Sequence, residues 1–411
     1  MIDRNEIIMM ANALSLNIDT VEKDYVLSWL LWGINNHKDS SNTWLFKGGT
    51  CLKKCFFETF RFSEDLDFTV TDAAHLSTDF LREKFHEITE NIYNETGIIF
   101  FKEQFKFKVL PKENGKLSAQ GAIHYNGPLR RRQGNTPSFA SIKIDLTTNE
   151  IIVLQPQTKR VHHPFSDEPT AGIWSMCYAF EEVIAEKIRA LGERARPRDL
   201  YDVIHFFRNR GMIDNIQLIY NVLIKKCGYK NITVPTYFAI ETHQKLDELN
   251  TQWHNMLAHQ LPALPPLESF WSDLEPFFQW IEGNLKERQL VSPSTLDGDI
   301  FQPGRITSAV SIDSVAQKIQ FAAANRVCVE FAYHNITRIV EPLSFRISKS
   351  GNKSFYGYEH GEPEPKKFTL SKIQKITVTN LGYVERQYPI EINANGHIIM
   401  PPIRRNTTKN H

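Results

Sequence analysis

The sequence lacks an excess of charge of either sign, since its 411 residues carry 48 Lys and Arg against 47 Asp and Glu. A net charge of +1 excludes a global basic field, so contact with nucleic acid requires a local patch. A long apolar run is also missing, because the most apolar stretch, residues 25–34, is too short to span a bilayer. The first residues, MIDRNEIIMMANAL, lack the apolar core of a signal peptide. We therefore expect a cytoplasmic protein with no membrane partner.

Cysteine is scarce and irregularly placed, at Cys51, Cys55, Cys177, Cys227 and Cys328. Cys51 and Cys55 have C-x3-C spacing, but no second Cys or His pair follows at the spacing of a zinc finger. The sequence on its own favours reduced thiols over a disulfide framework or a metal site.

The chain is too long for one ordinary domain core and predicts an α+β protein in several parts. Residues 1–170 mix helical and strand patterns, and residues 171–290 are helical. Residues 291–311 are rich in Ser, Pro and Gly and form the expected linker. Residues 312–397 hold one helix and then short strands separated by turns, which predicts a small β-barrel of the SH3 or Sm type.

Apolar periodicity places the main elements of the first part. Alternation predicts strands over residues 66–70, 100–110, 119–127 and 140–147, because side chains of a strand point to opposite faces in turn. Residues 77–95 have the period of an amphipathic helix instead. The first part is therefore expected to hold a sheet with helices packed on it.

The stretch 46–68, FKGGTCLKKCFFETFRFSEDLDF, is the centre of the predicted site. Residues 48–50 form a small-residue turn, and residues 52–60 are expected to form a short helix whose N-terminus faces an anion. Asp65 and Asp67 are two apart on a strand, so their carboxylates point the same way. Two like charges held this close are costly unless a cation lies between them. A divalent metal carrying the phosphates of a nucleotide is the usual occupant.

A third carboxylate, Asp145, lies between Ile144 and Leu146 on the strand 140–147. A carboxylate framed by hydrophobic residues on a later strand is what a two-carboxylate site needs in order to hold two metal ions.

Two later helices carry further charged candidates. The helix 177–192 contains Lys187 and is expected to end at Gly192. The next helix begins at Pro197 and has Asp199 in its first turn. Asp199 and Asp202 are three residues apart and share one helix face.

A basic loop follows the third predicted strand. Arg130, Arg131 and Arg132 are adjacent, and three arginines suit phosphate contacts with RNA or with a triphosphate. A solvated loop without a ligand is the alternative.

In combination these motifs resemble the AbiEii/AbiGii toxin family of the nucleotidyltransferase superfamily, over residues 20–290. The matching segments are Lys23-Asp24, Gly48-Gly49-Thr50, Arg61–Phe68, Ile144-Asp145-Leu146, Glu186–Leu191 and Arg198–Asp202. The resemblance implies a polymerase-β-like mixed sheet flanked by helices and followed by a helical domain. It also implies a toxin of a toxin–antitoxin or phage-defence system, with a cognate antitoxin as partner. Such a toxin transfers a nucleotide from an NTP to the 3′ acceptor end of tRNA, which blocks translation.

The resemblance also suggests a role for each site residue. Asp65, Asp67 and Asp145 would hold Mg²⁺ or Mn²⁺, and Asp145 would help to deprotonate the incoming hydroxyl. Lys187 would neutralise the triphosphate. Asp199 would orient Lys187 or act on the nucleotide, with a helix cap or an ion pair as its alternative. The remaining expected nucleotide contacts are Gly48, Gly49, Thr50, Ser63 and Arg198.

Residues 312–395 resemble, more weakly, the WYL-type small β-barrel of bacterial regulators and defence proteins. The Trp-Tyr-Leu that names this module is replaced by Phe355-Tyr356-Gly357. Its candidate ligand contacts are Arg338, Arg346, Lys366 and Lys367, with a solvated strand face as the alternative.

Two other functions stay open on the sequence alone. One is a non-catalytic nucleic-acid-binding regulator with a ligand-sensing barrel. The intact trio Asp65, Asp67 and Asp145 argues against it, because an inactive enzyme gains nothing from like charges held together. The other is transfer of a nucleotidyl or phosphoryl group to a protein, which the sequence does not separate from transfer to tRNA.

Overall fold

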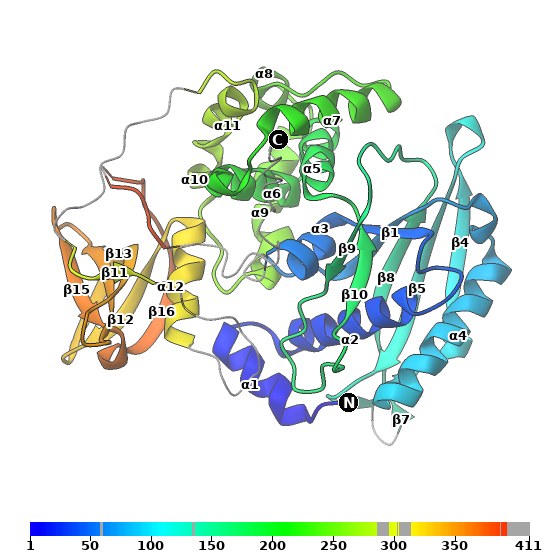
Figure 1. The fold of residues 1–411 in the computed structure, drawn as a ribbon, viewed down its shortest axis with the longest axis horizontal. Coiled ribbons are helices and arrows are strands. Elements are labelled where there is room, and N and C mark those ends of the chain that lie inside the picture. Colours follow the sequence, from blue (N-terminus) through cyan, green and yellow to red (C-terminus); the bar gives the residue numbers. More distant parts are fainter. Residues whose placement is uncertain are drawn as a thin grey trace, which may run out of the picture.

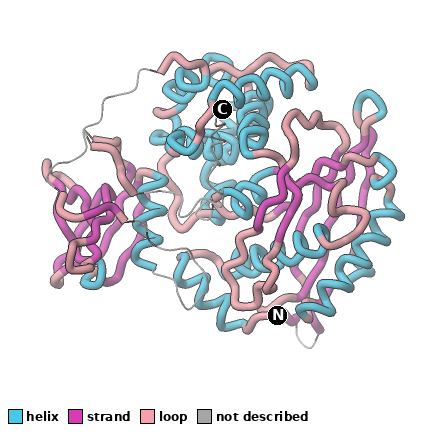
Figure 2. Tube along the Cα trace, viewed as in Figure 1, coloured by secondary structure: helices cyan, strands magenta, loops and turns pink. Residues whose placement is uncertain are grey.

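The computed structural model describes residues 1–57, 61–133, 136–285, 296–301, 303, 314–386 and 388–392. Figure 1 shows an α/β region in blue and cyan beside a cluster of green helices, with a smaller β region in yellow and red on the other side. Figure 2 shows the same division by element type, with strands concentrated in two separate places. These regions correspond to the α+β organisation expected from the sequence.

The large sheet is mixed, as predicted. Its strand order is β3-β5-β8-β2-β1-β10-β9, with β4 paired to β5. The pairs β2–β8 and β1–β10 are parallel, and the other pairs are antiparallel. The strands are β1 (Trp44–Lys47), β2 (Asp65–Val70), β3 (Ile99–Phe100), β4 (Lys106–Pro111), β5 (Leu117–Asn126), β8 (Ala140–Thr147), β9 (Gln157–Arg160) and β10 (Trp174–Cys177).

Helices α1 (Arg4–Leu14), α2 (Ile18–Asn35) and α4 (Thr78–Thr96) belong to the same region. The helix α4 confirms the amphipathic pattern of the sequence: Ser77 caps its first turn, and its apolar face is buried. It packs on α2 (Figure 1). Between β1 and β2 the chain forms α3 (Gly48–Cys51) and the π-helix η1 (Leu52–Phe56), so the helix expected over residues 52–60 is a single π turn that ends at Phe56.

The helical region follows β10 and begins with a helix longer than predicted. The helix α5 (Phe180–Arg194) continues past Gly192 and ends where Ala195 adopts a left-handed conformation. Gly192 is needed for packing, because a Cβ there would lie 2.3 Å from the ring of Pro235. The region continues with α6 (Pro197–Arg208), α7 (Ile216–Tyr229), α8 (Tyr237–Glu241), α9 (Leu246–Leu257), α10 (Leu267–Trp271) and α11 (Leu274–Ile281). Among the residues described, none of the helices combines the length and the apolar character needed to cross a bilayer.

The C-terminal module is a helix packed on a sheet of strand order β15-β14-β13-β12-β16, with β11 paired to β13. Its elements are β11 (Asp299–Ile300), α12 (Ser314–Asn325), β12 (Val327–Tyr333), β13 (Ile336–Ile347), β14 (Lys353–Glu359), β15 (Pro365–Thr369) and β16 (Gln374–Gly382). Within the described ranges β15 and β16 are not paired with each other, and it is this pairing that would close a barrel. The strand β11 lies inside the predicted linker, most of which is outside the described residues.

Ion pairs fix the C-terminal module to the helical region. Arg208 of α6 donates to Asp273 at 2.8 Å and to the carbonyl of Asn325, the last residue of α12, at 3.1 Å. Arg326 contacts the same Asp273 at 3.1 Å. Tyr201 of α6 donates to the side chain of Asn325 at 2.9 Å. The module is therefore held by side chains of the helix that also carries Asp199 and Asp202.

Candidate active site

The sheet brings the three predicted carboxylates together. Strands β2 and β8 run parallel with Asp67 directly beside Asp145, and neighbouring strands are about 4.8 Å apart. Asp65 is two residues before Asp67 and points to the same side. Asp67 and Asp145 line a cleft of about 570 Å³, together with Lys47 of β1. The prediction that Asp145 would join the pair on β2 agrees with this register.

The electrostatics of these carboxylates fit a cation. Burial, together with the charges of Asp145 and Asp65, raises the pKa of Asp67 to about 6, against the opposing effect of Lys47 and Lys187. Burial also raises the pKa of Asp65. No hydrogen bond or ion pair reaches either carboxylate from the residues that the structure describes. Oxygen ligands with negative charge and no protein partner are the donor set that Mg²⁺ prefers.

The Gly-Gly-Thr turn lies directly against the carboxylates. Gly48 has a φ of +81°, and a Cβ at this position would come within 2.1 Å of Oδ2 of Asp67. A Cβ at Gly49 would lie 3.1 Å from the hydroxyl of Ser63. Position 48 therefore requires glycine, both for its positive φ and for the close approach, whereas a side chain at position 49 would press on Ser63 and on Arg61. Thr50 is fully buried, and its hydroxyl donates to the backbone carbonyl of Asp65, so this side chain positions β2.

Lys187 of α5 lies in a second cavity that Asp67 also lines, but its carboxylate partner differs from the one expected. Its ammonium contacts Asp202 at 2.8 Å, and it lines a cavity of about 200 Å³ with Gly48 and Asp67. Asp202 also receives both nitrogens of Arg61, at 2.7 and 2.8 Å. Although burial opposes it, the charges of Arg61 and Lys187 lower the pKa of Asp202. The residue that orients Lys187 is thus Asp202.

Asp199 has a different partner. Its two oxygens accept hydrogen bonds from Arg194 at 2.6 and 2.8 Å, and Asp199 itself is fully buried. The expectation that Asp199 orients Lys187 is therefore wrong, and its alternative of an ion pair is correct. Arg194 keeps 43% of its side chain exposed and lines the same cavity as Lys187. Arg198 is half-buried and donates a long hydrogen bond to the carbonyl of Met256 at 3.4 Å. The negative charge of Asp65 is close enough to act on its guanidinium.

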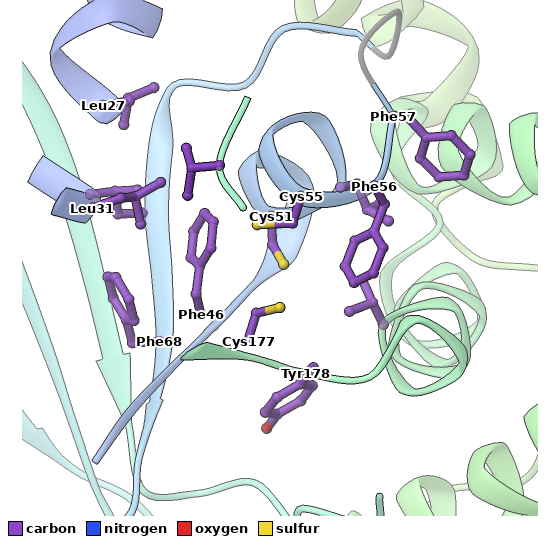
Figure 3. Packing of buried hydrophobic residues seen from close by; sticks show 14 of the residues in the cluster. Leu27, Leu31, Phe46, Cys51, Cys55, Phe56, Phe57, Phe68, Cys177 and Tyr178 are labelled. Carbon is purple, nitrogen blue, oxygen red and sulfur yellow. The ribbon is translucent and has the colours of Figure 1, made fainter. Parts of the chain in front are cut away.

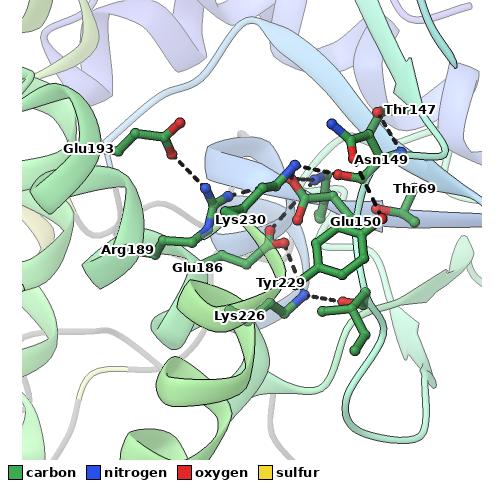
Figure 4. A network of polar contacts seen from close by, with 12 residues as sticks. Thr69, Thr147, Asn149, Glu150, Glu186, Arg189, Glu193, Lys226, Tyr229 and Lys230 are labelled. Atoms are coloured by element: carbon green, nitrogen blue, oxygen red, sulfur yellow. Dashed lines mark hydrogen bonds and ion pairs between the residues drawn. The ribbon is translucent and has the colours of Figure 1, made fainter. Parts of the chain in front are cut away.

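The sequence did not predict the network of ion pairs beside the cleft, which Figure 4 shows around Glu150 and Glu186. Glu186 contacts Lys226 at 3.0 Å and Lys47 at 3.7 Å, and burial is outweighed by these cations, which lower its pKa to about 2. Arg189 and Lys230 both reach Glu150, each at 3.4 Å (Figure 4). Glu186 is therefore a structural charge that holds Lys47 and Lys226. Lys47 precedes Gly48 directly, and that position was the available signal.

The three arginines of the basic loop have unequal surroundings. Arg131 is half-buried and forms ion pairs with Asp19, at 2.5 Å, and with the buried Glu22. Arg130 and Arg132 are exposed. The loop precedes β8 in the chain. Because a strand rises by about 3.3 Å per residue, the first residue of β8 lies roughly 16 Å from Asp145. Arg131 is therefore a structural residue, while its two neighbours are free to meet a ligand.

The predicted contacts of the C-terminal module are mostly occupied by internal pairs. Arg338 and Lys366 share Glu359, at 2.8 and 2.6 Å. The guanidinium of Arg346 donates to the carboxylate of Glu391. Lys367 is exposed. The solvated-face alternative fits Lys367, whereas the other three stabilise the sheet.

A mixed sheet with three adjacent carboxylates, a Gly-Gly turn packed on them and a lysine from the following helix defines the site of a nucleotidyltransferase. The family model described as "Nucleotidyl transferase AbiEii toxin, Type IV TA system" matches residues 29–281, more than half of the chain. The chain therefore belongs to the AbiEii family of nucleotidyltransferase toxins, which confirms the resemblance seen in the sequence. Membership implies an NTP substrate and an antitoxin partner.

Among solved structures the chain is similar to MenT4, a nucleotidyltransferase toxin from Mycobacterium tuberculosis H37Rv. The two are 18% identical, the match covers 69% of this chain and 90% of that chain, and the TM-score is 0.41. A comparison with curated proteins gives no match. The C-terminal module lies outside the family match, so its WYL-like character stays a prediction.

Proposed function

We propose that this toxin transfers a nucleotide from an NTP to the 3′ acceptor end of tRNA, with Mg²⁺ or Mn²⁺ held by Asp65, Asp67 and Asp145. The observation that carries the proposal is the parallel register of Asp67 and Asp145, together with the lack of any hydrogen bond or ion pair from the described residues to the carboxylates of Asp65 and Asp67. When bound, a divalent ion offsets the charge of the triphosphate and of the reacting oxygens. The tRNA acceptor follows from the family resemblance and is supported by the exposed Arg130 and Arg132.

The residues around the cleft suit an in-line transfer. The acceptor hydroxyl oxygen forms a bond to the α-phosphorus, and the bond to pyrophosphate breaks. Asp145 takes the proton of the hydroxyl; one of its oxygens is held by Gln120 at 2.8 Å, and none of the described residues bonds the other. Lys187 and the exposed Arg194 face the phosphates as cations. Gly48 and Gly49 let the phosphates approach the backbone.

The test is a labelling experiment. The purified protein is incubated with Mg²⁺, total tRNA and each labelled NTP in turn, beside an Asp65→Ala/Asp67→Ala variant. The matched control is Asp72→Asn, an aspartate just after the same strand whose side chain is 54% exposed. We expect label on RNA with the wild type and with the control, and none with the double variant. Periodate oxidation of the tRNA, which destroys the 3′ hydroxyl, should abolish the label.

Two results would overturn the proposal at different points. Label on protein with none on RNA would replace tRNA by a protein acceptor. Absence of transfer to any macromolecule with any NTP would favour the non-catalytic regulator. The division of the chain at residues 170, 290 and 311, and the cytoplasmic location, stay predictions.

A further inference from the structure

Three of the cysteines meet in the core of the α/β region. The sulfur atoms of Cys51 in α3, Cys55 in η1 and Cys177 in β10 all lie within 4.8 Å of one another. Figure 3 shows the sulfurs turned toward each other among Phe46 and Phe56. All three side chains are 0% exposed. The sequence argument against a metal site rested on the lack of a further ligand after Cys55, and folding supplies that ligand from β10.

The backbone holds the cluster in place from two sides. The amide of Phe57 donates to the carbonyl of Leu52 at 2.8 Å, which closes a π turn through the segment that carries Cys55. Such turns are rare and frequently occur at functional sites. Cys51 and Cys55 are four residues apart and share a helix face. Cys177 is fixed opposite them by its parallel pairing with Phe46 of β1.

A buried cation completes the electrostatic environment. Lys159 of β9 is 8% exposed. Its ammonium lies 5.8 Å from the centroid of the Phe56 ring, and Phe56 follows Cys55 directly in the chain. Three thiolates have a net charge of −1 around Zn²⁺ and −2 around Cu⁺, and Lys159 offsets one unit of it. Buried thiolates without such compensation would be costly.

We propose that Cys51, Cys55 and Cys177 form a binding site for a thiophilic d¹⁰ metal ion, Zn²⁺ or Cu⁺. A metal–sulfur bond of about 2.3 Å places the sulfurs of a trigonal set about 4.0 Å apart, within the observed spacing. Thiolate sulfur selects these soft ions. Three thiols bind one ion and release three protons, so no electron is transferred. In the part of the chain that the structure describes, no His, Asp or Glu oxygen or nitrogen joins the cluster, which favours three-sulfur coordination.

The site would fasten the Gly-Gly-Thr turn to the sheet. Cys51 follows Thr50 directly, and the hydroxyl of Thr50 holds the backbone of Asp65. A metal bridge from Cys51 to Cys177 would thus link the turn to β10. The ion is separate from the catalytic carboxylates, and its presence is measured without NTP or RNA, so this inference does not depend on the proposed function.

The test uses the full chain, purified under reducing and anaerobic conditions from cells supplied with zinc and copper. Elemental analysis measures the metal content, and X-ray absorption at the Zn or Cu edge measures the number of sulfur neighbours. Apo protein is also titrated with Cd²⁺, whose thiolate complexes absorb in the ultraviolet. The substitution Cys177→Ser removes one ligand. The matched control is Cys227→Ser, which changes a cysteine of α7 that is also buried.

We expect one ion per chain, three sulfur neighbours, and a Cd²⁺ absorption that saturates at one equivalent. Cys177→Ser should weaken binding by more than about a hundredfold, since removal of a ligand exceeds the 10–100-fold cost of changing a residue behind one. Cys227→Ser should bind like the wild type. If Cys177→Ser does not fold, the sulfur count in the wild type decides. Failure of the wild type to retain Zn²⁺ or Cu⁺ and to bind Cd²⁺, or a disulfide between two of the three cysteines, would overturn the inference.

Discussion

The aspartates of the large sheet and those of α6 have the same chemistry and opposite surroundings. Asp67 faces a cleft, and neither Asp67 nor Asp65 beside it has a hydrogen bond or ion pair from the described residues. Asp199 and Asp202 are fully buried, and each binds an arginine through both oxygens. An unpaired carboxylate at a cleft is available to a cation from solution, whereas a paired one fixes a cationic side chain. The first group is therefore the one proposed to hold the metal, and the second fixes the cations that line the cavity beside it.

Lys187 connects the two groups. It is bound to Asp202 on one side and faces Asp67 across the cavity on the other. Because Arg61 alone can satisfy Asp202, removing Lys187 should leave the helices intact. A variant at Lys187 therefore separates an effect on activity from an effect on stability.

The largest expected effect is the loss of activity in Asp67→Asn and in Asp65→Asn. Metal-assisted charge stabilisation supplies several kcal/mol, so the transfer rate should fall by at least about a thousandfold. Initial rates of label transfer at saturating NTP measure this. Asp72→Asn should keep the wild-type rate, and a carboxylate variant within tenfold of wild type would contradict the contrast between the groups.

The next effect is on stability. Asp202→Ala leaves the buried Arg61 without its carboxylate and should lower the free energy of unfolding by about 3–5 kcal/mol. Asp199→Ala should cost less, because its partner Arg194 is 43% exposed and water can solvate it. Lys187→Met should keep wild-type stability but lose transfer activity. Urea unfolding followed by circular dichroism gives the three values, and equal losses for Asp202→Ala and Asp199→Ala would refute the ranking.

The raised pKa of Asp67 predicts a pH dependence of stability in metal-free protein. Its pKa is about 6 when folded and 3.8 ordinarily, so the folded state binds the proton more tightly. The contribution of this proton to the free energy of unfolding is complete below pH 3.8 and is lost as pH rises through about 6. With allowance for partial exposure the loss is about 2 kcal/mol. Melting curves with a chelator at pH 4.5 and pH 8 should differ less in Asp67→Asn than in the wild type; identical pH profiles would exclude this origin.

The smallest effect concerns the basic loop, where the same comparison applies to arginines. The exposed pair, Arg130 and Arg132, should contribute to RNA affinity, so their double alanine variant should bind tRNA roughly tenfold more weakly at low salt and melt normally. Arg131→Ala should instead lower the melting temperature, because it leaves the buried Glu22 with one partner fewer. Filter binding and thermal melting distinguish the two. The opposite assignment of effects would show that the loop has another conformation on RNA.

Local periodicity placed most elements correctly, although the strand expected over residues 100–110 is divided into β3 and β4 by a 3₁₀ turn at Lys102–Gln104. The strands β2, β5 and β8 and the helices α4 and α6 lie where alternation or helical spacing puts them. The predicted end of α5 at Gly192 was wrong. Gly192 is needed because the ring of Pro235, on a distant segment, packs against it, and the helix continues past it to Arg194. The helix after the Gly-Gly-Thr turn became a π turn for a similar reason, because Cys55 and Phe56 pack into the core beside β10.

The sequence by itself determined that Asp65, Asp67 and Asp145 share a face, since a strand alternates with period two and the family resemblance joins the segments. Only the tertiary structure decided that Lys187 pairs with Asp202 and that Cys177 meets Cys51. Asp199 and Asp202 lie on one turn of one helix, and nothing local separates them. Which of them receives a given cation depends on distances of a few ångströms after α5 and α6 have packed, because charge pairs weaken steeply with separation and solvation.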